Sequence, residues 1–305
     1  MNNIKSPQIS FSKKIGLFLC LWFFSTIIGS FIVGFITLKF GVDSTPALRI
    51  ATTIQDLVIF ILPAIATAML ISRLPATFLS IDKFAKKKHY ILTLMTLIVS
   101  IPAMNYIIDW NESMQLPESM KGIEEWMRNS ENNAAIMVKT MLGQPDIPNL
   151  ILSILIVGVL AGLSEELFFR GTLQKILLSK PFNAHIAIWI TAFIFSAIHM
   201  QFYGFIPRLL LGAFFGYLVM WSGSLWLPIV AHAFNNITTV FVTWLYNRGS
   251  IDIDPNKFGA TTTALDTTIA ITSVIATIVM IIYLKKSFSQ TSYDGKQNHV
   301  QDISL

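Results

Sequence analysis

The stretch PNLILSILIVGVLAGLSEELFFRGTLQKI, residues 148–176, decides the fold, because it is long enough to cross a membrane yet carries charges in its second half. A helix needs about 20 mostly apolar residues to span the hydrocarbon core. Here two adjacent glutamates, Glu165 and Glu166, follow an uncharged run, and Arg170 comes four residues later. Ionisable side chains inside a bilayer are costly, so each of the three is a candidate functional residue.

Seven further apolar segments surround this stretch, at 15–38, 51–72, 90–108, 185–203, 206–222, 225–246 and 264–284. Together they predict an all-α fold, a polytopic transmembrane helix bundle of about eight spans, because the segments are too long and too uniformly apolar for barrel strands. Composition agrees with this class. Hydrophobic residues make up 53% of the 305-residue chain and charged residues only 13%, against about 25% in soluble domains.

The spans divide the chain into five parts. We expect an N-tail at 1–14, N-terminal transmembrane helices and a loop at 15–147, a core at 148–246, a loop and the last helix at 247–286, and a tail at 287–305. The tail is polar and is predicted to be disordered. Pro63 and Pro102 should kink their helices, and Ser222-Gly223-Ser224 should form a tight hairpin.

Basic residues indicate the orientation of the chain. With the N-terminus in the cytoplasm, most of the 22 Lys and Arg residues fall on cytoplasmic segments, and the acid-rich loop at 109–147 lies outside. The positive-inside rule therefore favours two cytoplasmic termini. We interpret the helical stretch within this loop either as a solvated cap on the bundle or as a lid over a membrane cavity.

Charge and cysteine content exclude two classes of function. The net charge of +5 is distributed over the ends of the spans rather than gathered in one patch, so nucleic acid is not expected as a partner. The one cysteine, Cys20, lies in an apolar run, so the chain has neither a disulfide framework nor a thiolate metal site.

Asp56 and Asp266 are placed near helix ends. The ionisable residues that we single out inside the predicted spans are Glu165, Glu166, Arg170, His199 and His232. Arg170 follows Glu166 at i+4, the favourable order for an ion pair on a helix. Glu165 points about 100° away from Glu166 and has no counter-ion built into its own helix. An unpaired buried carboxylate takes up a proton readily, as a general base must.

Two other spans carry spaced polar pairs. His199 follows Phe195 at i+4, and Asn236 follows His232 at i+4, so each pair shares one helix face. Alone, each has an ordinary explanation as a packed histidine or an interhelical amide. With Glu165 at a compatible depth, they predict one site. A carboxylate and an imidazole can activate water, while an imidazole and an amide can stabilise an oxyanion. The chain contains neither H-E-x-x-H nor G-x-S-x-G.

The motifs Glu165-Glu166-x-x-x-Arg170, Phe195-x-x-x-His199 and His232-x-x-x-Asn236 resemble those of the CPBP family of membrane proteins, over about residues 148–246. The family includes CAAX prenyl endopeptidases and abortive-infection or bacteriocin-immunity proteases. The resemblance implies a multi-pass protein of a bacterial cell membrane that hydrolyses a peptide or protein beside the bilayer. It implies no cofactor and no metal.

The same resemblance implies a role for each motif residue. Glu165, with His199, acts on the water, and His232 with Asn236 forms the oxyanion hole. The supporting residues are Glu166, Arg170 and Phe195.

Two alternatives stay open. Glu165, His199 and His232 together are also a legitimate zinc-ligand set, which would make the protein a metal-dependent membrane protease. The chain could instead be a non-catalytic membrane protein that scaffolds or sequesters a partner, for example in immunity to a bacteriocin.

Overall fold

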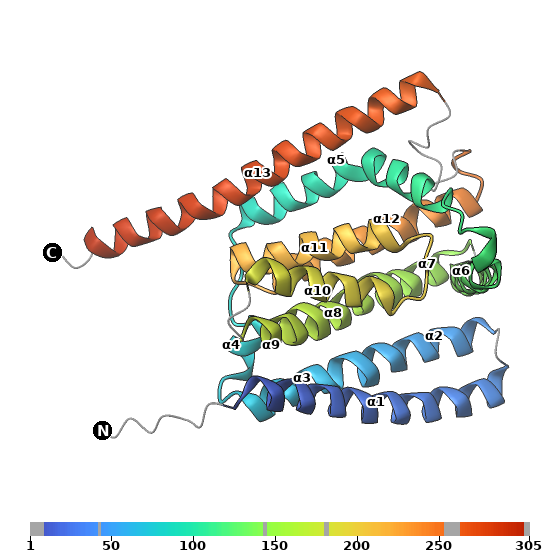
Figure 1. Ribbon diagram of the computed structural model, residues 1–305, viewed down its shortest axis with the longest axis horizontal. Coiled ribbons are helices and arrows are strands. Elements are labelled where there is room, and N and C mark those ends of the chain that lie inside the picture. The colour runs from blue at the N-terminus through green and yellow to red at the C-terminus, as the bar shows by residue number, and fades with distance from the viewer. Residues whose placement is uncertain (1–8, 42–43, 143–144, 180–182, 253–262, 302–305) are drawn as a thin grey trace.

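The structure is a computed structural model, and it describes residues 9–41, 44–142, 145–179, 183–252 and 263–301. The described residues form helices and turns and contain no strand (Figure 1). In chain order the helices are α1 Phe11–Phe40, α2 Thr45–Ile54, η1 Gln55–Ile61, α3 Leu62–Ile71, α4 Pro75–Leu79, α5 Lys87–Glu112, η2 Glu118–Met120, α6 Lys121–Leu142, α7 Ile147–Ser153, η3 Ile154–Leu160, α8 Ala161–Glu166, η4 Leu167–Leu173, α9 Gln174–Leu178, α10 Ala184–Ala197, α11 Phe205–Ser222, α12 Trp226–Asn247 and α13 Ala264–Gln301. Here η1, η3 and η4 are π-helical, and η2 is a 3₁₀ turn.

Within the described residues, six helical runs are long and apolar enough to cross a membrane. They are 11–40, 45–71, 87–112, 147–178, 205–222 and 264–289. Of the two remaining predicted spans, α10 is apolar but shorter, and α12 carries His232 and three asparagines. These eight helical runs match the eight predicted spans in position. The prediction of an all-α membrane protein is confirmed.

Some predicted boundaries were wrong. The second span begins at Thr45 rather than 51, so Asp56 lies in the middle of a helical run and not near its end. α10 ends at Ala197, which places His199 in the turn after the helix. α13 continues past Ser287 to Gln301, so the tail predicted as disordered is helical there. Residues 1–8 of the N-tail and 302–305 of the C-tail lie outside the described residues.

Capping hydrogen bonds and one glycine explain where several helices begin or end. The Ser44 hydroxyl accepts a hydrogen bond from Ala47 N at the start of α2, and the Asp146 carboxylate accepts one from Asn149 N at the start of α7. The predicted hairpin forms after α11, where Gly223 adopts φ +66°, a left-handed conformation that glycine accepts without strain.

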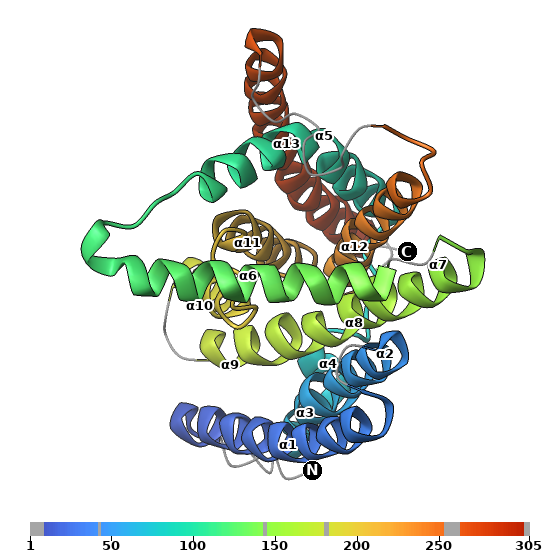
Figure 2. The ribbon, with the colours of Figure 1, turned by 90° about the vertical axis from the view of Figure 1, so that its right-hand side faces the viewer.

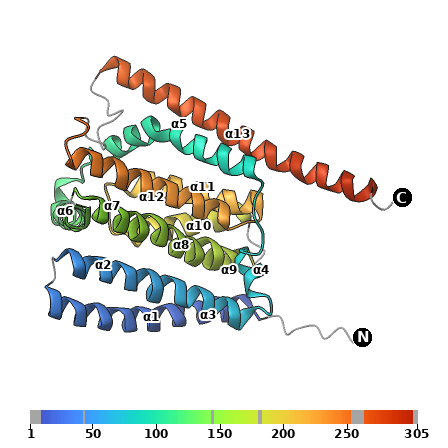
Figure 3. The same ribbon diagram turned by 180° about the vertical axis from the view of Figure 1, so that it is seen from behind.

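Pro102 interrupts the hydrogen-bond ladder of α5, and α13 repairs it. The Ser273 hydroxyl donates to Val99 O at 2.5 Å and accepts from Ala103 N at 3.1 Å. The two backbone groups that would bond to each other in a regular helix are thereby both satisfied. This contact joins α5 to α13 along one side of the bundle (Figures 1 and 3).

The helical run from α7 to α9 lies inside the stack of helices, with the α1–α3 layer on one side and α10, α11 and α12 on the other (Figures 1 and 3). Close packing against α12 depends on Gly162. A Cβ added there would lie 2.9 Å from the backbone nitrogen of Ala233, too close for a side chain. All seven residues of η4 are buried.

α6 crosses one end of the bundle, opposite the end where α1 begins and α13 finishes (Figures 1 and 2). We call it the α6 strap. Its middle is attached to the loop between α10 and α11, where Glu131 Oε2 accepts from Tyr203 N at 3.2 Å and the Trp126 and Phe202 rings lie 5.1 Å apart. Its C-terminal end is attached to α2, where Arg49 Nη2 donates to Met141 O at 3.0 Å. The strap therefore connects the loop that follows His199 to the N-terminal layer.

Candidate active site

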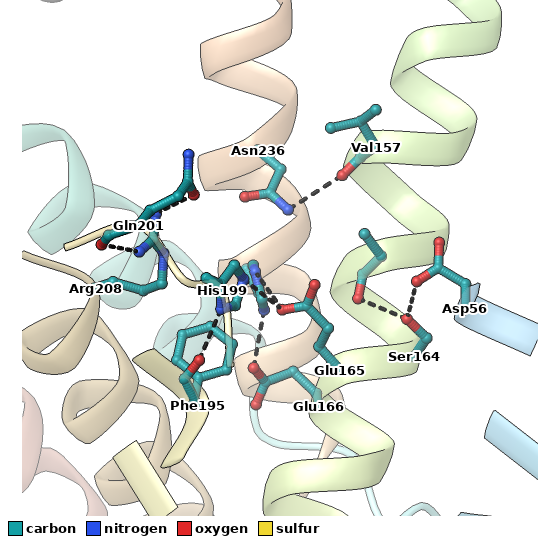
Figure 4. Close-up of polar contacts among 12 residues, drawn as sticks. Asp56, Val157, Ser164, Glu165, Glu166, Phe195, His199, Gln201, Arg208 and Asn236 are labelled. Carbon is teal, nitrogen blue, oxygen red and sulfur yellow. Dashed lines mark hydrogen bonds and ion pairs between the residues drawn. The ribbon is translucent and has the colours of Figure 1, made fainter. Parts of the chain in front are cut away.

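Three elements bring the predicted residues together (Figure 4). Glu165 and Glu166 end α8, which lies between the π-helical runs η3 and η4. His199 comes from the turn after α10, and His232 from the second turn of α12. Wide π-turns inside α-helices occur frequently at functional sites, since they redirect side chains that a regular helix would place elsewhere.

Glu166 is the centre of a fully buried ion-pair network. Its Oε1 lies 2.6 Å from Arg170 Nη1 and 2.9 Å from His232 Nδ1. Neither the Glu166 nor the Arg170 side chain is exposed. The i+4 pair predicted from the sequence is thus formed, and His232 is a second partner that the sequence did not indicate.

Arg170 has several further contacts inside the bundle. Its Nη2 donates to Gly212 O at 2.8 Å. Its guanidinium carbon lies 4.5 Å from the centroid of the Phe195 ring and 5.6 Å from that of Phe215, within cation–π range. Phe195 therefore supports the site through its ring, and the network connects η4, α10, α11 and α12.

Glu165 faces the two histidines instead. Its Oε2 lies 3.9 Å from His199 Nε2 and 3.8 Å from His232 Nε2. The Glu165 side chain is 12% exposed, and Oε2 has no hydrogen-bond partner among the described residues. Adjacent glutamates thus have different surroundings. Glu166 lies in a closed ion-pair network, whereas Glu165 lies between two imidazoles with no hydrogen bond to Oε2 among the described residues.

The partners of the two histidines define their protons. His199 Nδ1 lies 2.7 Å from Phe195 O, and a carbonyl can only accept, so Nδ1 carries the hydrogen. His232 Nδ1 donates in the same way to the ion-paired Glu166 carboxylate at 2.9 Å. In the neutral form of each ring, Nε2 is then a free acceptor directed at Glu165.

Asn236 lies one turn further along α12 and is turned toward η3. Its Nδ2 donates to Val157 O at 3.1 Å (Figure 4). Within the described residues it makes no hydrogen bond to Glu165, His199 or His232. One amide hydrogen on Nδ2 remains available after the bond to Val157.

Two residues beside the site were not among the predicted ones. Asp56, on η1, accepts from the Ser164 hydroxyl at 2.6 Å and is only 1% exposed (Figure 4). Ser164 immediately precedes Glu165, so the bond fixes the rotation of α8 about its axis. Arg208, on the first turn of α11, interacts electrostatically with His199 and donates from Nη2 to Gln201 Oε1 at 2.7 Å (Figure 4). The sequence signal for both was an ionisable residue within an apolar run.

A metal centre finds no geometric support. Across the part of the chain that the structure describes, no group of three His, Cys, Asp or Glu side chains is placed to hold a metal ion. This includes Glu165, His199 and His232, the set considered above as zinc ligands.

Residues 147–238 match the family model described as type II CAAX prenyl endopeptidase, Rce1-like. They include every predicted site residue, from Glu165 to Asn236. This segment belongs to the Rce1-like family. The family is one of peptidases, and the apolar helices make this chain a multi-pass integral membrane protein.

One curated relative of the Rce1-like segment is the uncharacterized protein YpbD of Bacillus subtilis (strain 168). It is 29% identical over 98 residues, which cover 31% of this chain and 45% of the relative. The chain thus matches less than half the length of that relative. No solved structure matches the chain.

Proposed function

We propose that this protein is an intramembrane, metal-independent glutamate endopeptidase that cleaves a peptide or protein segment beside the membrane. The observation that carries the proposal is the junction of Glu165 Oε2 with two imidazole Nε2 atoms at 3.8 and 3.9 Å. The Rce1-like match of residues 147–238 supports the class of reaction.

The junction suits a water molecule as nucleophile. Glu165 Oε2 and His199 Nε2 both accept hydrogen bonds, so they cannot bond to each other without a shared proton. A water oxygen about 2.8 Å from both atoms can donate one hydrogen to each. As its oxygen attacks a peptide carbonyl, one proton passes to Glu165. That proton is later delivered to the leaving amine, so the carboxylate is regenerated.

Two residues of α12, His232 and Asn236, stabilise the oxyanion in this mechanism. His232 donates through Nε2 only when that atom also carries a hydrogen, so the ring acts as an imidazolium with Nδ1 held by Glu166. The carboxylates of Glu165 and Glu166, on either side of the ring, balance its charge. The remaining amide hydrogen of Asn236 is the second donor, provided that its side chain turns partly away from Val157.

The test is Glu165→Gln, which preserves the shape of the side chain and removes the base. Loss of a general base lowers turnover by about 10²- to 10⁴-fold. Membranes containing wild type, Glu165→Gln or the control Glu118→Gln are compared by quantitative proteomics at equal expression, Glu118 being an exposed glutamate on the surface. Peptides released by wild type and by the control should be missing from the Glu165→Gln sample. Identical peptide profiles in all three samples would reject the proposal and favour a scaffold.

A further inference from the structure

Arg208 is a cation beside the site whose charge has no close partner. In the described residues no carboxylate lies within 4.0 Å of its guanidinium, and the guanidinium donates there to one residue, Gln201, through Oε1 at 2.7 Å and the backbone oxygen at 3.4 Å. A guanidinium has five N–H donors, so most of its donor capacity remains available. Glu131 and Glu165 act on it only through longer-range electrostatics.

Holding Gln201 does not explain a charged side chain here. A neutral amide or hydroxyl could donate to Gln201 at a much smaller desolvation cost, since charges in a membrane segment are expensive. Arg170, which packs against the Phe195 ring, shows how the same protein compensates an arginine that only supports the fold, with a carboxylate at 2.6 Å.

The guanidinium is also held in place. Gly204 lies against it, because a Cβ added at that position would be 3.3 Å from Nη2. Gln201 fixes it from the same loop, and its charge acts on His199 through longer-range electrostatics (Figure 4). A planar guanidinium with free donors, near enough to Glu165 and His199 to act on them electrostatically, matches the geometry of a carboxylate, which arginine binds with two parallel hydrogen bonds.

We propose that Arg208 binds a carboxylate of the peptide substrate and thereby selects substrates that carry an acidic group near the scissile bond. The carboxylate comes either from an Asp or Glu side chain or from the end of the substrate chain. This inference rests on the proposed peptidase function. It makes Arg208 a specificity-determining residue and gives Gly204 and Gln201 the task of orienting it.

The experiment uses the full chain in liposomes and a set of apolar peptides matched in all but one group. One arm compares a free C-terminus with a C-terminal amide, and the other compares Glu with Gln at each position in amidated peptides. Mass spectrometry measures cleavage. Binding of the same fluorescently labelled peptides to Glu165→Gln protein is measured in parallel.

In wild type, a carboxylate-bearing peptide should have a KM about 10- to 100-fold lower than its amide partner, the range of a charge-assisted hydrogen bond. Arg208→Gln should bring this ratio to about one, and Arg208→Lys should retain part of it. Arg73→Gln, which removes an exposed arginine, should leave the ratio as in wild type. The arm that shows the preference identifies the source of the carboxylate.

The outcomes separate the two proposals. Cleavage with the same acid-to-amide ratio in wild type and Arg208→Gln overturns the role of Arg208 and leaves the peptidase function standing. Binding to Glu165→Gln protein with an Arg208-dependent preference for the acid, but no cleavage by wild type, overturns the peptidase and keeps the carboxylate site. If the peptides are neither cleaved nor bound, both proposals are overturned.

Discussion

Two regions of the molecule hold an arginine close to the candidate site, and they treat its charge in opposite ways. In η4, Arg170 is unexposed, lies 2.6 Å from Glu166 and donates to Gly212 O. At the start of α11, Arg208 is partly exposed, bonds only to Gln201 in the described contacts, and lies next to the loop that meets the α6 strap. The closed network holds helices together, whereas the open one has donors left for a ligand.

The largest effect should follow from breaking the closed network. Arg170→Met removes the guanidinium that lies 2.6 Å from the buried Glu166 carboxylate, which costs about 3–5 kcal/mol of folding free energy. Arg208→Met removes a side chain with no ion pair and should cost about 1 kcal/mol or less. Equilibrium unfolding in mixed detergent micelles measures both.

The double variant Glu166→Gln/Arg170→Met is the control, because it removes both charges at once. It should recover much of the stability lost in Arg170→Met. Equal losses for Arg170→Met and Arg208→Met would contradict the distinction between the two regions.

A smaller effect should come from the glycines that lie against the two guanidinium groups. A Cβ on Gly212 would be 3.0 Å from the Phe195 ring and 3.2 Å from Arg170 Nη2, both fixed by packing. Gly212→Ala should therefore destabilise the fold by about 1–3 kcal/mol through overpacking. A Cβ on Gly204 would meet only the end of the Arg208 side chain, so Gly204→Ala should stay within about 0.5 kcal/mol. The same unfolding measurement ranks them, and the reverse order would refute this reading.

The smallest effect concerns the α6 strap beside Arg208. The Arg128 guanidinium bonded to Glu124, with help from Leu116 N, holds the pKa of the Glu124 carboxyl below its usual range. A lowered pKa means that the contact stabilises the strap fully above the ordinary pKa, about 4.3, and is lost as pH falls through the lowered value. Hydrogen exchange of residues 116–128, corrected for intrinsic rates, should accelerate between about pH 5 and pH 3.

Glu124→Gln provides the comparison for the strap, since its exchange should lack this pH-dependent step. Amides of η4, which is buried throughout, should show no such acceleration over the same range. A step that persists in Glu124→Gln would assign the titration to another group.

Local spacing made part of the site predictable. The Glu166–Arg170 pair follows from i+4 geometry within one helix, which the sequence alone supplies. The bond from His232 to Glu166 depends on how α12 is rotated against α8, 66 residues away, and no local pattern specifies that rotation. Local spacing therefore predicted the ion pair within one helix but not the bond between two helices.

The other errors of the prediction came from misplaced helix boundaries. Asp56 was set aside because the second span was started at 51, although Ser44 and Pro46 are an N-cap and a first-turn proline that mark the true start. His199 was expected on a helix, whereas the chain leaves α10 at Ala197 and Met200 adopts φ +53°. A left-handed conformation at a non-glycine residue is uncommon and has no sequence signature here.

The two partners of Glu166 are synthesised at different times. Arg170 is synthesised four residues after Glu166, within the same helix, whereas His232 follows 66 residues later, on a helix that must still enter the membrane. Until α12 arrives, the ion pair with Arg170 is the compensation that the α7–α9 run brings with it into the bilayer. The i+4 spacing thus gives the α7–α9 run its own charge compensation before α12 is made, and the bond from His232 completes the network later.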